Sequence, residues 1–312
     1  MNPQQKPVWL GFRGSLRMIR KEKWLYLLLI PGILYYAIFC YKPMWGIIYA
    51  FENYSIKKGV FGSPWVGFSN FVRFFQSPSF WMLFRNTTVL ALTNLVFYFP
   101  APIILALLLN EVKHIKFKRT VQSLTYLPHF LSWVIIYGIF QNLFSAEGGV
   151  VNLLIQQFTG HTISFLESSF WFRPLYLLQT VWKEIGWGTI IFLAALSSVD
   201  LTLYEAAVVD GAGHWKRMLH ITLPCIMPTI ITLLILRMGS FLNTGFEQIF
   251  MLRNTMNRSV SEVFDTYVYN IGITGGQFSY ATAIGLFKSA IGLVLVFGAD
   301  RLAKKIGQEG IL

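Results

Sequence analysis

Apolar residues occur along this chain in long runs that are separated by shorter polar segments. A helix needs about 20 mostly apolar residues to cross the hydrocarbon core of a bilayer. Six runs of that length carry few charges, at approximately residues 26–50, 87–110, 124–144, 174–196, 224–246 and 280–302. The fourth run is interrupted by Lys183 and Glu184. The pattern predicts an all-α membrane protein with six transmembrane helices.

Basic residues cluster in the short segments that flank these runs, and such residues are retained on the cytoplasmic side of a membrane. The clusters are Lys6, Arg13, Arg17, Arg20, Lys21 and Lys23; Lys113, Lys116, Lys118 and Arg119; and Arg301, Lys304 and Lys305. Six spans then put both termini in the cytoplasm, together with residues 200–223. The longer, less basic segments 52–86, 145–173 and 247–279 are expected outside.

The first apolar run and its basic flank resemble a signal peptide. The run is too long for one and lacks an A-x-A-like cleavage site, so we expect a retained anchor helix. No long linker, low-complexity tract or obvious repeat divides the rest. We therefore expect a basic cytoplasmic segment at 1–23, one six-helix domain at 24–306 with a cytoplasmic loop at about 200–223, and a cytoplasmic tail at 307–312.

Composition agrees with a membrane protein. Residues are 54% hydrophobic and 13% charged, whereas charged residues approach a quarter of a soluble globule. The net charge of +12 would suggest nucleic acid as a partner of a soluble protein, but membrane topology accounts for it here. Cys40 and Cys225 have no CxxC spacing and no neighbouring histidine ligands. No disulfide framework or metal site is expected.

The loop between the fourth and fifth runs has a helix, turn, helix pattern. Residues 205–209 are compatible with a short helix, Gly211 and Gly213 permit a sharp turn, and residues 215–221 can form a further turn of helix. Small residues at this place would let a partner surface approach closely.

The same loop resembles the EAA---G---------I-LP loop of the permease subunits of binding-protein-dependent ABC importers. Glu205, Ala206 and Ala207 are followed by Gly211 six positions after the glutamate, and then by Ile221, Leu223 and Pro224. The resemblance implies a coupling helix that docks in a groove on a cytoplasmic ATPase. The residues expected to carry coupling are Glu205, Ala206, Ala207, Asp210, Gly211, Ala212, Gly213, Leu223 and Pro224.

The resemblance covers most of the chain, because IPGILYYAIFCYKPMWGIIYAF and YATAIGLFKSAIGLVLVFGADRLAKKIG look like the oligosaccharide and polysaccharide branch of that family. It implies the type I importer permease fold, a bacterial plasma membrane location, and carbohydrate uptake by alternating access. The implied partners are a second homologous permease, as a heterodimer, two cytoplasmic ATPases and an extracellular solute-binding protein. The saccharide, the identity of the second permease and ATPase, and whether that permease is instead a second copy of this chain stay open.

No GxxxxGK[ST] phosphate loop occurs in the chain. We therefore expect a transport subunit that is not itself an enzyme and that holds no cofactor, with ATP and Mg bound by the partner ATPase. An ion-coupled secondary transporter would show related halves with broken helices or paired intramembrane acids, and no convincing internal symmetry is found. An integral-membrane enzyme would need a catalytic cluster, which the available residues do not supply.

Charged groups within a span cost about 2.5 to 3.5 kcal/mol at its centre and usually face a cavity or a partner. Polar residues recur at helical spacing along the fifth run, at Arg237, Ser240, Asn243, Thr244 and Glu247. The stripe could line the translocation pathway and bind sugar hydroxyls. Alternatively, Arg237 and Glu247 snorkel toward opposite interfaces while the others contact a helix. For Arg237 we favour snorkelling, and for Asn243 and Glu247 both interpretations stay open.

The fourth run offers a second set of pathway residues. Lys183 and Glu184, with Trp182 and Trp187 nearby, could bind an anionic or neutral saccharide or could anchor the helix at the membrane interface. The pathway candidates are thus Lys183, Trp187, Ser240, Asn243 and Glu247. In the last run, Lys288 is expected to pair within the bundle or to snorkel.

Overall fold

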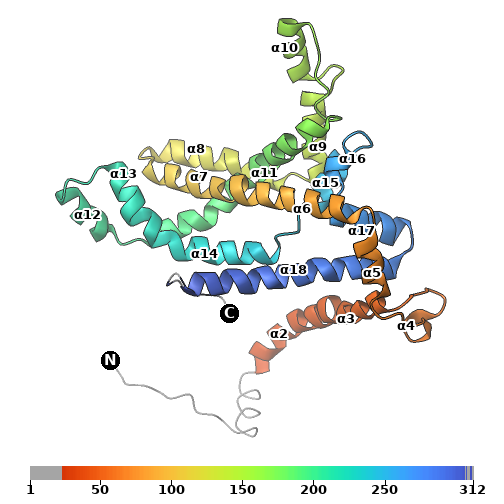
Figure 1. Ribbon diagram of the computed structural model, residues 1–312. Helices are drawn as coiled ribbons and strands as arrows, with labels where there is room; N and C mark the ends of the chain where they lie inside the picture. The colour runs from red at the N-terminus through yellow and green to blue at the C-terminus, as the bar shows by residue number, and fades with distance from the viewer. Residues whose placement is uncertain (1–22, 306, 308–309, 311–312) are drawn as a thin grey trace.

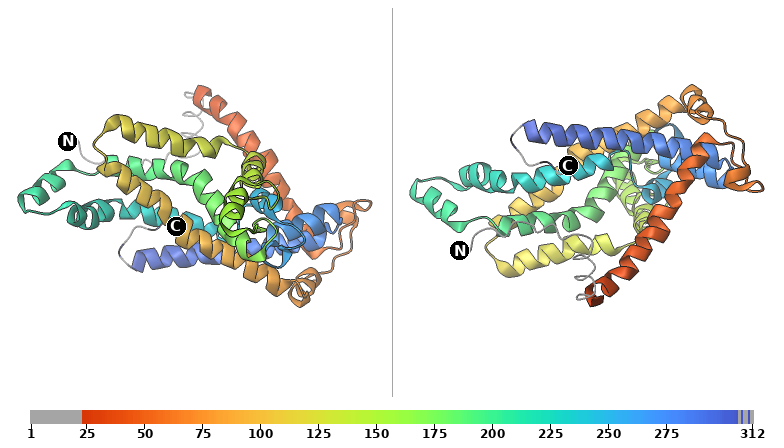
Figure 2. Two further views of the ribbon diagram at one scale, coloured as in Figure 1. Left: turned by 90° about the horizontal axis from the view of Figure 1, so that it is seen from above. Right: turned by 90° about the horizontal axis from the view of Figure 1, so that it is seen from below.

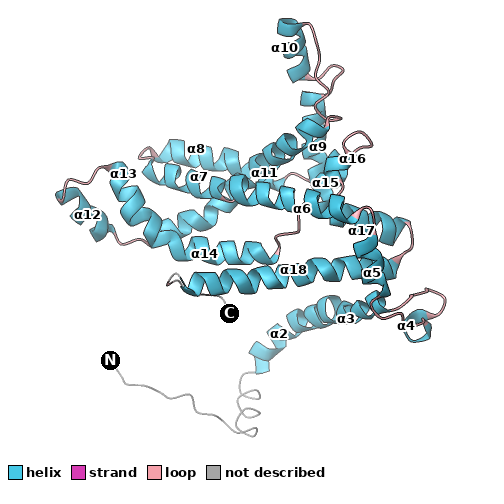
Figure 3. Cartoon of the chain, in the orientation of Figure 1, coloured by secondary structure: helices cyan, strands magenta, loops and turns pink. Residues whose placement is uncertain are grey.

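The computed structural model describes residues 23–305, 307 and 310, and within them it is built from helices (Figure 3). The basic residues of the predicted segment 1–23 other than Lys23, and most of the predicted tail, lie outside the described residues. One isolated β-bridge joins Glu52 and Trp65. The predicted all-α class is confirmed.

The helices follow one another without any longer β-structure in the described part of the chain. The α-helices are α2 (Lys23–Tyr35), α3 (Lys42–Met44), α4 (Gly59–Gly62), α5 (Ser69–Gln76), α6 (Phe80–Thr93), α7 (Pro100–Glu111), α8 (Ile115–Tyr126), α9 (Trp133–Phe144), α10 (Val150–Thr159), α11 (Ser169–Ser197), α12 (Leu201–Val209), α13 (His214–Arg217), α14 (Leu223–Gly239), α15 (Phe246–Leu252), α16 (Arg258–Ser261), α17 (Phe264–Val268) and α18 (Phe278–Lys305). The π- or 3-10-helical turns are η1 (Tyr36–Tyr41), η2 (Trp45–Phe51), η3 (Asn94–Tyr98), η4 (Leu127–Phe130), η5 (Met218–Thr222) and η6 (Tyr269–Thr274).

Helices α7, α8, α11, α14 and α18 form a bundle, and α11 packs on α7, α8 and α14 (Figure 1). One core cluster joins three of these helices through Ile103 of α7, Phe192 and Leu196 of α11, and Ile226 of α14. Burial of such large apolar side chains fixes the relative positions of the helices. The long helix α11 therefore serves as the framework against which the functional segments are placed.

Two glycines let neighbouring helices approach α11 closely. A Cβ atom at Gly186 would lie 2.2 Å from the backbone oxygen of Thr125 in α8. A Cβ atom at Gly188 would lie 2.9 Å from Cγ of Pro102 in α7. The sequence Gly-Trp-Gly thus seats α11 against two helices and leaves Trp187 between the two contacts.

Four continuous helical stretches are long and apolar enough to cross a membrane, and up to six spans result if each of two bent helix pairs counts as one. The four stretches are Lys23–Phe51, Phe80–Glu111, His214–Gly239 and Phe278–Lys305. The two bent pairs are Ile115–Phe130 with Trp133–Phe144, and Ser169–Ser197 with Leu201–Val209. The count of six spans stays a prediction.

The third predicted run is not one helix. Residues 124–144 cross the end of η4 at Phe130 and the start of α9 at Trp133, where the helix axis turns by 105°. Ser132 caps the new helix by accepting a hydrogen bond from the backbone N–H of Ile135 at 3.3 Å. Helix α9 consequently leaves the bundle and carries α10 away from it (Figure 1).

The fifth predicted run is also broken. Helix α14 ends at Gly239, residues 240–245 are not helical, and Gly245 has φ +87°, a left-handed conformation that suits glycine. The prediction that Arg237, Ser240, Asn243, Thr244 and Glu247 share one helical face is therefore wrong. Irregular backbone buried in a membrane protein needs hydrogen-bond partners, and the structure supplies protein partners for this break.

The α7–α8 connection, the α12–α13 segment and the C-terminal end of α18 gather at one end of the bundle, at the left of Figure 1. The predicted cytoplasmic segments of residues 113–119, 200–223 and 301–305 thus share one end. The first apolar stretch, Lys23–Phe51, runs obliquely to the bundle axis in both views of Figure 2 and has a single buried residue, Ala50. It contacts α18 through η2.

Candidate coupling and translocation sites

Helix α12 begins with a side-chain cap. Asp200 accepts a hydrogen bond from the backbone N–H of Thr202 at 2.9 Å, which satisfies one of the free donors at a helix start. Hydrogen bonds from the backbone and side chain of Thr202 lower the pKa of Asp200. Because only the carboxylate form accepts this bond fully, the cap persists until the pH falls below the ordinary range of an aspartate.

Helix α12 ends in the turn that Gly211 was predicted to form. Gly211 has φ +75°, and its backbone N–H donates to the oxygen of Val208 at 3.0 Å. The N–H of Ala212 donates to the oxygen of Ala207 at 2.8 Å. These two bonds make a Schellman motif with Asp210 as the C-cap. The chain then reverses direction and enters α13, whose N-cap is Gly213.

Two side-chain contacts attach this helix–turn–helix to the bundle. The hydroxyls of Tyr204 in α12 and Thr222 before α14 lie 2.9 Å apart. Nδ1 of His214 lies 3.0 Å from Oε2 of Glu111 at the end of α7, and Arg217 contacts the same imidazole. The loop is thus connected to both α7 and α14, while its outer side is free of contacts with the described bundle.

The coupling residues predicted from the sequence lie on this exposed unit. Glu205, Ala206 and Gly211 are exposed, and no residue of α12 or α13 is buried. Leu223 and Pro224 open α14, where the missing N–H of proline at the first turn removes no helical hydrogen bond. The predicted helix–turn–helix is confirmed, and its cytoplasmic location and role in coupling stay predictions.

Apolar side chains project from the same unit. Val209 is 88% exposed and Trp215 is 72% exposed, and Leu201 and Val208 are also exposed. Beside Trp215, a cavity of about 410 Å³ is lined by residues of α7, α13 and η5. Exposed apolar side chains rimmed by charges at one end of a bundle are typical of a surface that another protein covers.

A buried polar network holds the break after α14. The hydroxyl of Tyr176 in α11 donates to the backbone oxygen of Thr244 at 2.7 Å and accepts from Asn94 at 2.6 Å. The side-chain amide of Gln248 donates to the backbone oxygen of Tyr176 at 2.8 Å. These four residues are at most 3% exposed. Helix α11 and η3 therefore position the irregular residues 240–245.

The three pathway candidates near this break differ in environment. The hydroxyl of Ser240 donates to the backbone oxygen of Arg237 at 3.3 Å. Asn243 and Glu247 are both exposed and form no side-chain hydrogen bond or ion pair within the described residues. Asn243, in the break that follows α14, and Glu247, at the start of α15, are thus available to a ligand, whereas the hydroxyl of Ser240 is engaged by a neighbouring backbone oxygen.

Lys183 is engaged by the bend between η4 and α9. Its ammonium donates to the backbone oxygens of His129 and Leu131, each at 2.6 Å, and the residue is 7% exposed. These carbonyls are left free by the end of η4, so Lys183 caps the bend from a helix more than fifty residues away. Trp187, one turn further along α11, is 47% exposed. Neither residue contacts Asn243 or Glu247 through the described side-chain hydrogen bonds.

His129 was missed by the sequence analysis as part of this region. Its Nδ1 lies 2.8 Å from Oε2 of Glu184, and its ring stacks on Trp187 with centroids 4.4 Å apart. A histidine beside an apolar run gives little signal of its own, although Pro128 marks a change of direction. In the last span, Lys288 pairs with Asp265, which is the first of the two outcomes expected for it.

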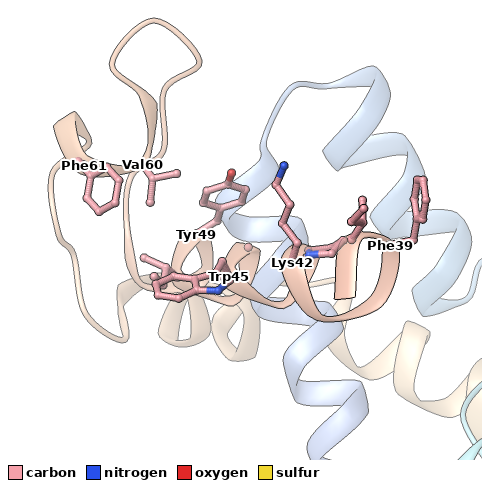
Figure 4. A pocket seen from close by; sticks show the side chains of 10 residues that line it. Phe39, Lys42, Trp45, Tyr49, Val60 and Phe61 are labelled. Carbon is pink, nitrogen blue, oxygen red and sulfur yellow. The ribbon is translucent and has the colours of Figure 1, made fainter. Parts of the chain in front are cut away.

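An apolar hollow of about 770 Å³ lies beside the first helical stretch (Figure 4). Phe39, Trp45, Tyr49 and Phe61 line it, and Lys42 is its one charged lining residue. A saccharide site needs several convergent polar groups, so this lining does not suit one. Among the described residues, no group of three His, Cys, Asp or Glu side chains could hold a metal ion.

The sequence matches the family described as "Binding-protein-dependent transport system inner membrane component" over residues 90–308. The exposed helix–turn–helix and the bundle of apolar helices are therefore those of a membrane permease. The chain belongs to this family of ABC importer permeases of the inner membrane.

Particular relatives are similar over nearly the whole chain. Protein LplB of Bacillus subtilis (strain 168) is 57% identical, over 98% of this chain and 96% of its own length. The polygalacturonan/rhamnogalacturonan transport system permease protein YteP of the same organism is 53% identical over 93% of this chain and 91% of its own length.

A crystal structure has the same fold. It is that of a bacterial alginate ABC transporter in complex with an alginate pentasaccharide-bound periplasmic protein. One of its chains aligns with a TM-score of 0.87 and 39% identity, covering 95% of this chain and 99% of that one.

Proposed function

We propose that this chain is the pore-forming permease of an ATP-driven importer that takes up an oligosaccharide or polysaccharide fragment. An extracellular solute-binding protein delivers the saccharide, and a separate ATPase drives alternating access. The observation that carries the proposal is the exposed unit of α12 and α13, with its Schellman turn at Gly211, at one end of an apolar bundle in a chain of this family.

The coupling residues act together in this proposal. Glu205 and the small residues Ala206 and Ala207 offer a helix surface that a groove on an ATPase can accept. The apolar side chains of Leu201 and Val209 leave water when the ATPase binds, which contributes favourable free energy. Movement of the bound ATPase then reaches α14 through the contact between Tyr204 and Thr222.

The saccharide class has its support in the relatives. YteP, which is 53% identical, is a polygalacturonan/rhamnogalacturonan transport system permease. The aligned crystal structure is that of an alginate ABC transporter. Asn243 and Glu247, exposed at the break after α14, have side chains that can bind sugar hydroxyls. We assign them to the translocation pathway.

The complete importer in this proposal contains a second, homologous permease, two cytoplasmic ATPases and the solute-binding protein. ATP and Mg are bound by the ATPases, and this chain contributes no ATPase site of its own. The exposed unit supports this division, because α12 provides mainly apolar and small residues, α13 adds Trp215 and basic residues, and the sequence has no phosphate-binding loop.

The test is ATP hydrolysis by the importer, purified with its neighbours in nanodiscs, with and without loaded solute-binding protein. The probe is a digest of rhamnogalacturonan that carries a fluorescent end label. We expect the loaded binding protein to stimulate hydrolysis and the label to enter proteoliposomes.

Glu205→Lys and Gly211→Asp should lower stimulated hydrolysis by about tenfold or more, since about 1.4 kcal/mol of lost docking energy is sufficient for that. Lys116→Ala, on exposed α8, is the control and should change neither quantity.

An importer in which both loop variants hydrolyse ATP and transport normally would overturn the coupling assignment. If no ATPase co-purifies and uptake follows an ion gradient instead, an ion-coupled carrier becomes the better explanation.

A further inference from the structure

The imidazole of His129 in η4 contacts the carboxylate of Glu184 near the middle of helix α11. Nδ1 of His129 is 2.8 Å from Oε2 of Glu184, and their side chains are 26% and 23% exposed. Helix α11 has 29 residues, and Glu184 is the sixteenth, so this carboxylate is remote from both ends of α11. Ionisable groups in the middle of a helix that crosses a membrane are costly and mark a functional site by default.

An aromatic surface adjoins this pair. The imidazole of His129 stacks on the indole of Trp187 with centroids 4.4 Å apart and planes 3° from parallel. Phe130 approaches the same indole edge-on at 6.0 Å. Trp187 is nevertheless 47% exposed and Phe130 is 71% exposed. The side chains thus combine a rigid aromatic surface with an adjacent carboxylate.

The surrounding backbone fixes this arrangement in advance. Gly186 and Gly188, on either side of Trp187, let α8 and α7 approach α11. The ammonium of Lys183 holds the backbone oxygens of His129 and Leu131 at 2.6 Å. His129 is therefore held against Trp187 before any ligand arrives, and such preorganisation lowers the entropic cost of binding. Lys183 acts as a positioning residue.

The carboxylate keeps one oxygen for a ligand. Oε2 of Glu184 contacts His129, while Oε1 lies 3.9 Å from the Lys183 ammonium, beyond hydrogen-bond distance. An ionised carboxylate only accepts hydrogen bonds, so this oxygen suits a hydroxyl donor and repels a second carboxylate. The neighbouring indole suits an apolar C–H face. A pyranose ring has both features, since its C–H face is apolar and its rim carries hydroxyls.

We propose that Trp187, His129 and Glu184 form a binding site for a hydroxyl-rimmed pyranose ring of the transported saccharide, within the translocation pathway. This inference rests on the proposed function. In it, Trp187 stacks on the apolar face of the ring, Oε1 of Glu184 accepts a hydrogen bond from a ring hydroxyl, and His129 fixes the orientation of both.

Uptake by the complete importer tests the site. The importer with its solute-binding protein is placed in proteoliposomes, and the concentration of end-labelled rhamnogalacturonan digest that gives half-maximal uptake is measured. We expect Trp187→Ala to raise that concentration by about tenfold, and Trp187→Tyr, which keeps an aromatic face, to stay within about threefold of wild type. Glu184→Gln should raise it as well, since the amide replaces an ionised acceptor.

Trp182→Ala is the matched control. Trp182 lies on the same helix, is 37% exposed and packs near Phe140 instead of His129. It should leave uptake unchanged. Basal ATP hydrolysis without binding protein should equal that of wild type in the Trp182→Ala importer. If Trp187→Ala fails to assemble, Glu184→Gln decides: reduced uptake by an intact complex supports the site, and wild-type uptake overturns it.

The two proposals fail in different ways. A wild-type importer that takes up no labelled saccharide overturns the proposed function, and this site with it. If wild type transports while Trp187→Ala and Glu184→Gln transport equally well, only the site is overturned. Loss of the second permease from a complex in which the Trp187→Ala chain still reaches the membrane at wild-type level also overturns the site, because this surface is then a subunit interface.

Discussion

Gly211 and Gly213 are both turn residues in the sequence, but the structure gives them different backbone conformations. Gly211 has φ +75° at the end of α12, whereas Gly213 has φ −67°, which any residue can adopt. A Cβ atom at either glycine would meet no atom within 4 Å. The two positions therefore differ in backbone conformation and not in the space available for a Cβ atom.

We predict that Gly211→Ala destabilises the end of α12 by about 1–2 kcal/mol, because a Cβ atom disfavours the left-handed region. Hydrogen exchange of the α12 amides, followed by mass spectrometry on the purified importer, should become faster. Gly213→Ala is the control and should exchange like wild type. Equal acceleration in both variants would mean that crowding by a partner, and not the Schellman turn, makes glycine necessary here.

Lys183 illustrates what a sequence does not contain. The sequence suggested saccharide binding or interface anchoring for Lys183, and a contact with the backbone of another helix was not among these alternatives. The partners are two backbone oxygens at a helix bend, contributed by residues 129 and 131. A sequence pattern cannot show which carbonyls a bend will release, because that depends on where the other helix ends in space.

At the scale of elements, close helix approach depends on particular glycines. We predict that Gly186→Ala lowers the midpoint of thermal unfolding of the purified complex, because a Cβ atom 2.2 Å from the Thr125 oxygen must push α8 away from α11. Overpacking of this kind costs about 1–3 kcal/mol.

Gly285→Ala in α18 is the matched control, because a Cβ atom there would meet nothing within 4 Å. This variant should unfold at or slightly above the wild-type temperature, since alanine favours helix over glycine. A Gly186→Ala complex as stable as wild type would show that α8 can move without cost, and α11 would then not be the rigid framework described above.

Hydropathy located the apolar helices but not their interruptions. The long runs follow from the thickness of a bilayer, so α7, α14 and α18 fall within the predicted ranges or overlap them closely. The bend after Phe130 and the break at 240–245 are apolar enough that hydropathy averaged over about 20 residues does not reveal them. Their stability comes from Lys183 and Tyr176, which belong to another run, so only the folded bundle reveals them.

At the scale of the whole molecule, α14 joins the two regions of interest. It starts beside Thr222, at the exposed unit of α12 and α13, and ends at the break that Tyr176 holds. A helix of 17 residues is a rigid connector about 25 Å long. Helix α13 continues through η5 into α14 as one helical stretch, and the contact between Tyr204 and Thr222 joins α12 to that stretch, so movement of the coupling unit can reach the break along α14.

The hydroxyls of Tyr204 in α12 and Thr222, the N-cap of α14, lie 2.9 Å apart and connect the two helices directly. We predict that Tyr204→Phe and Thr222→Val each lower the number of saccharides transported per ATP hydrolysed by a few-fold, with assembly intact, because a single lost hydrogen bond is worth about 1 kcal/mol. The measurement is uptake and ATP hydrolysis in the same proteoliposomes.

The double variant gives the decisive comparison. If the two hydroxyls act through one bond, the double variant should be no worse than either single variant. Independent, additive losses would contradict this, since each residue would then act through other contacts, such as the bond from Thr222 to the backbone oxygen of Arg217 at 3.4 Å. In that case the connection from the ATPase to the break would run instead through His214 and Glu111 to α7, and His214→Ala should show the larger loss of coupling.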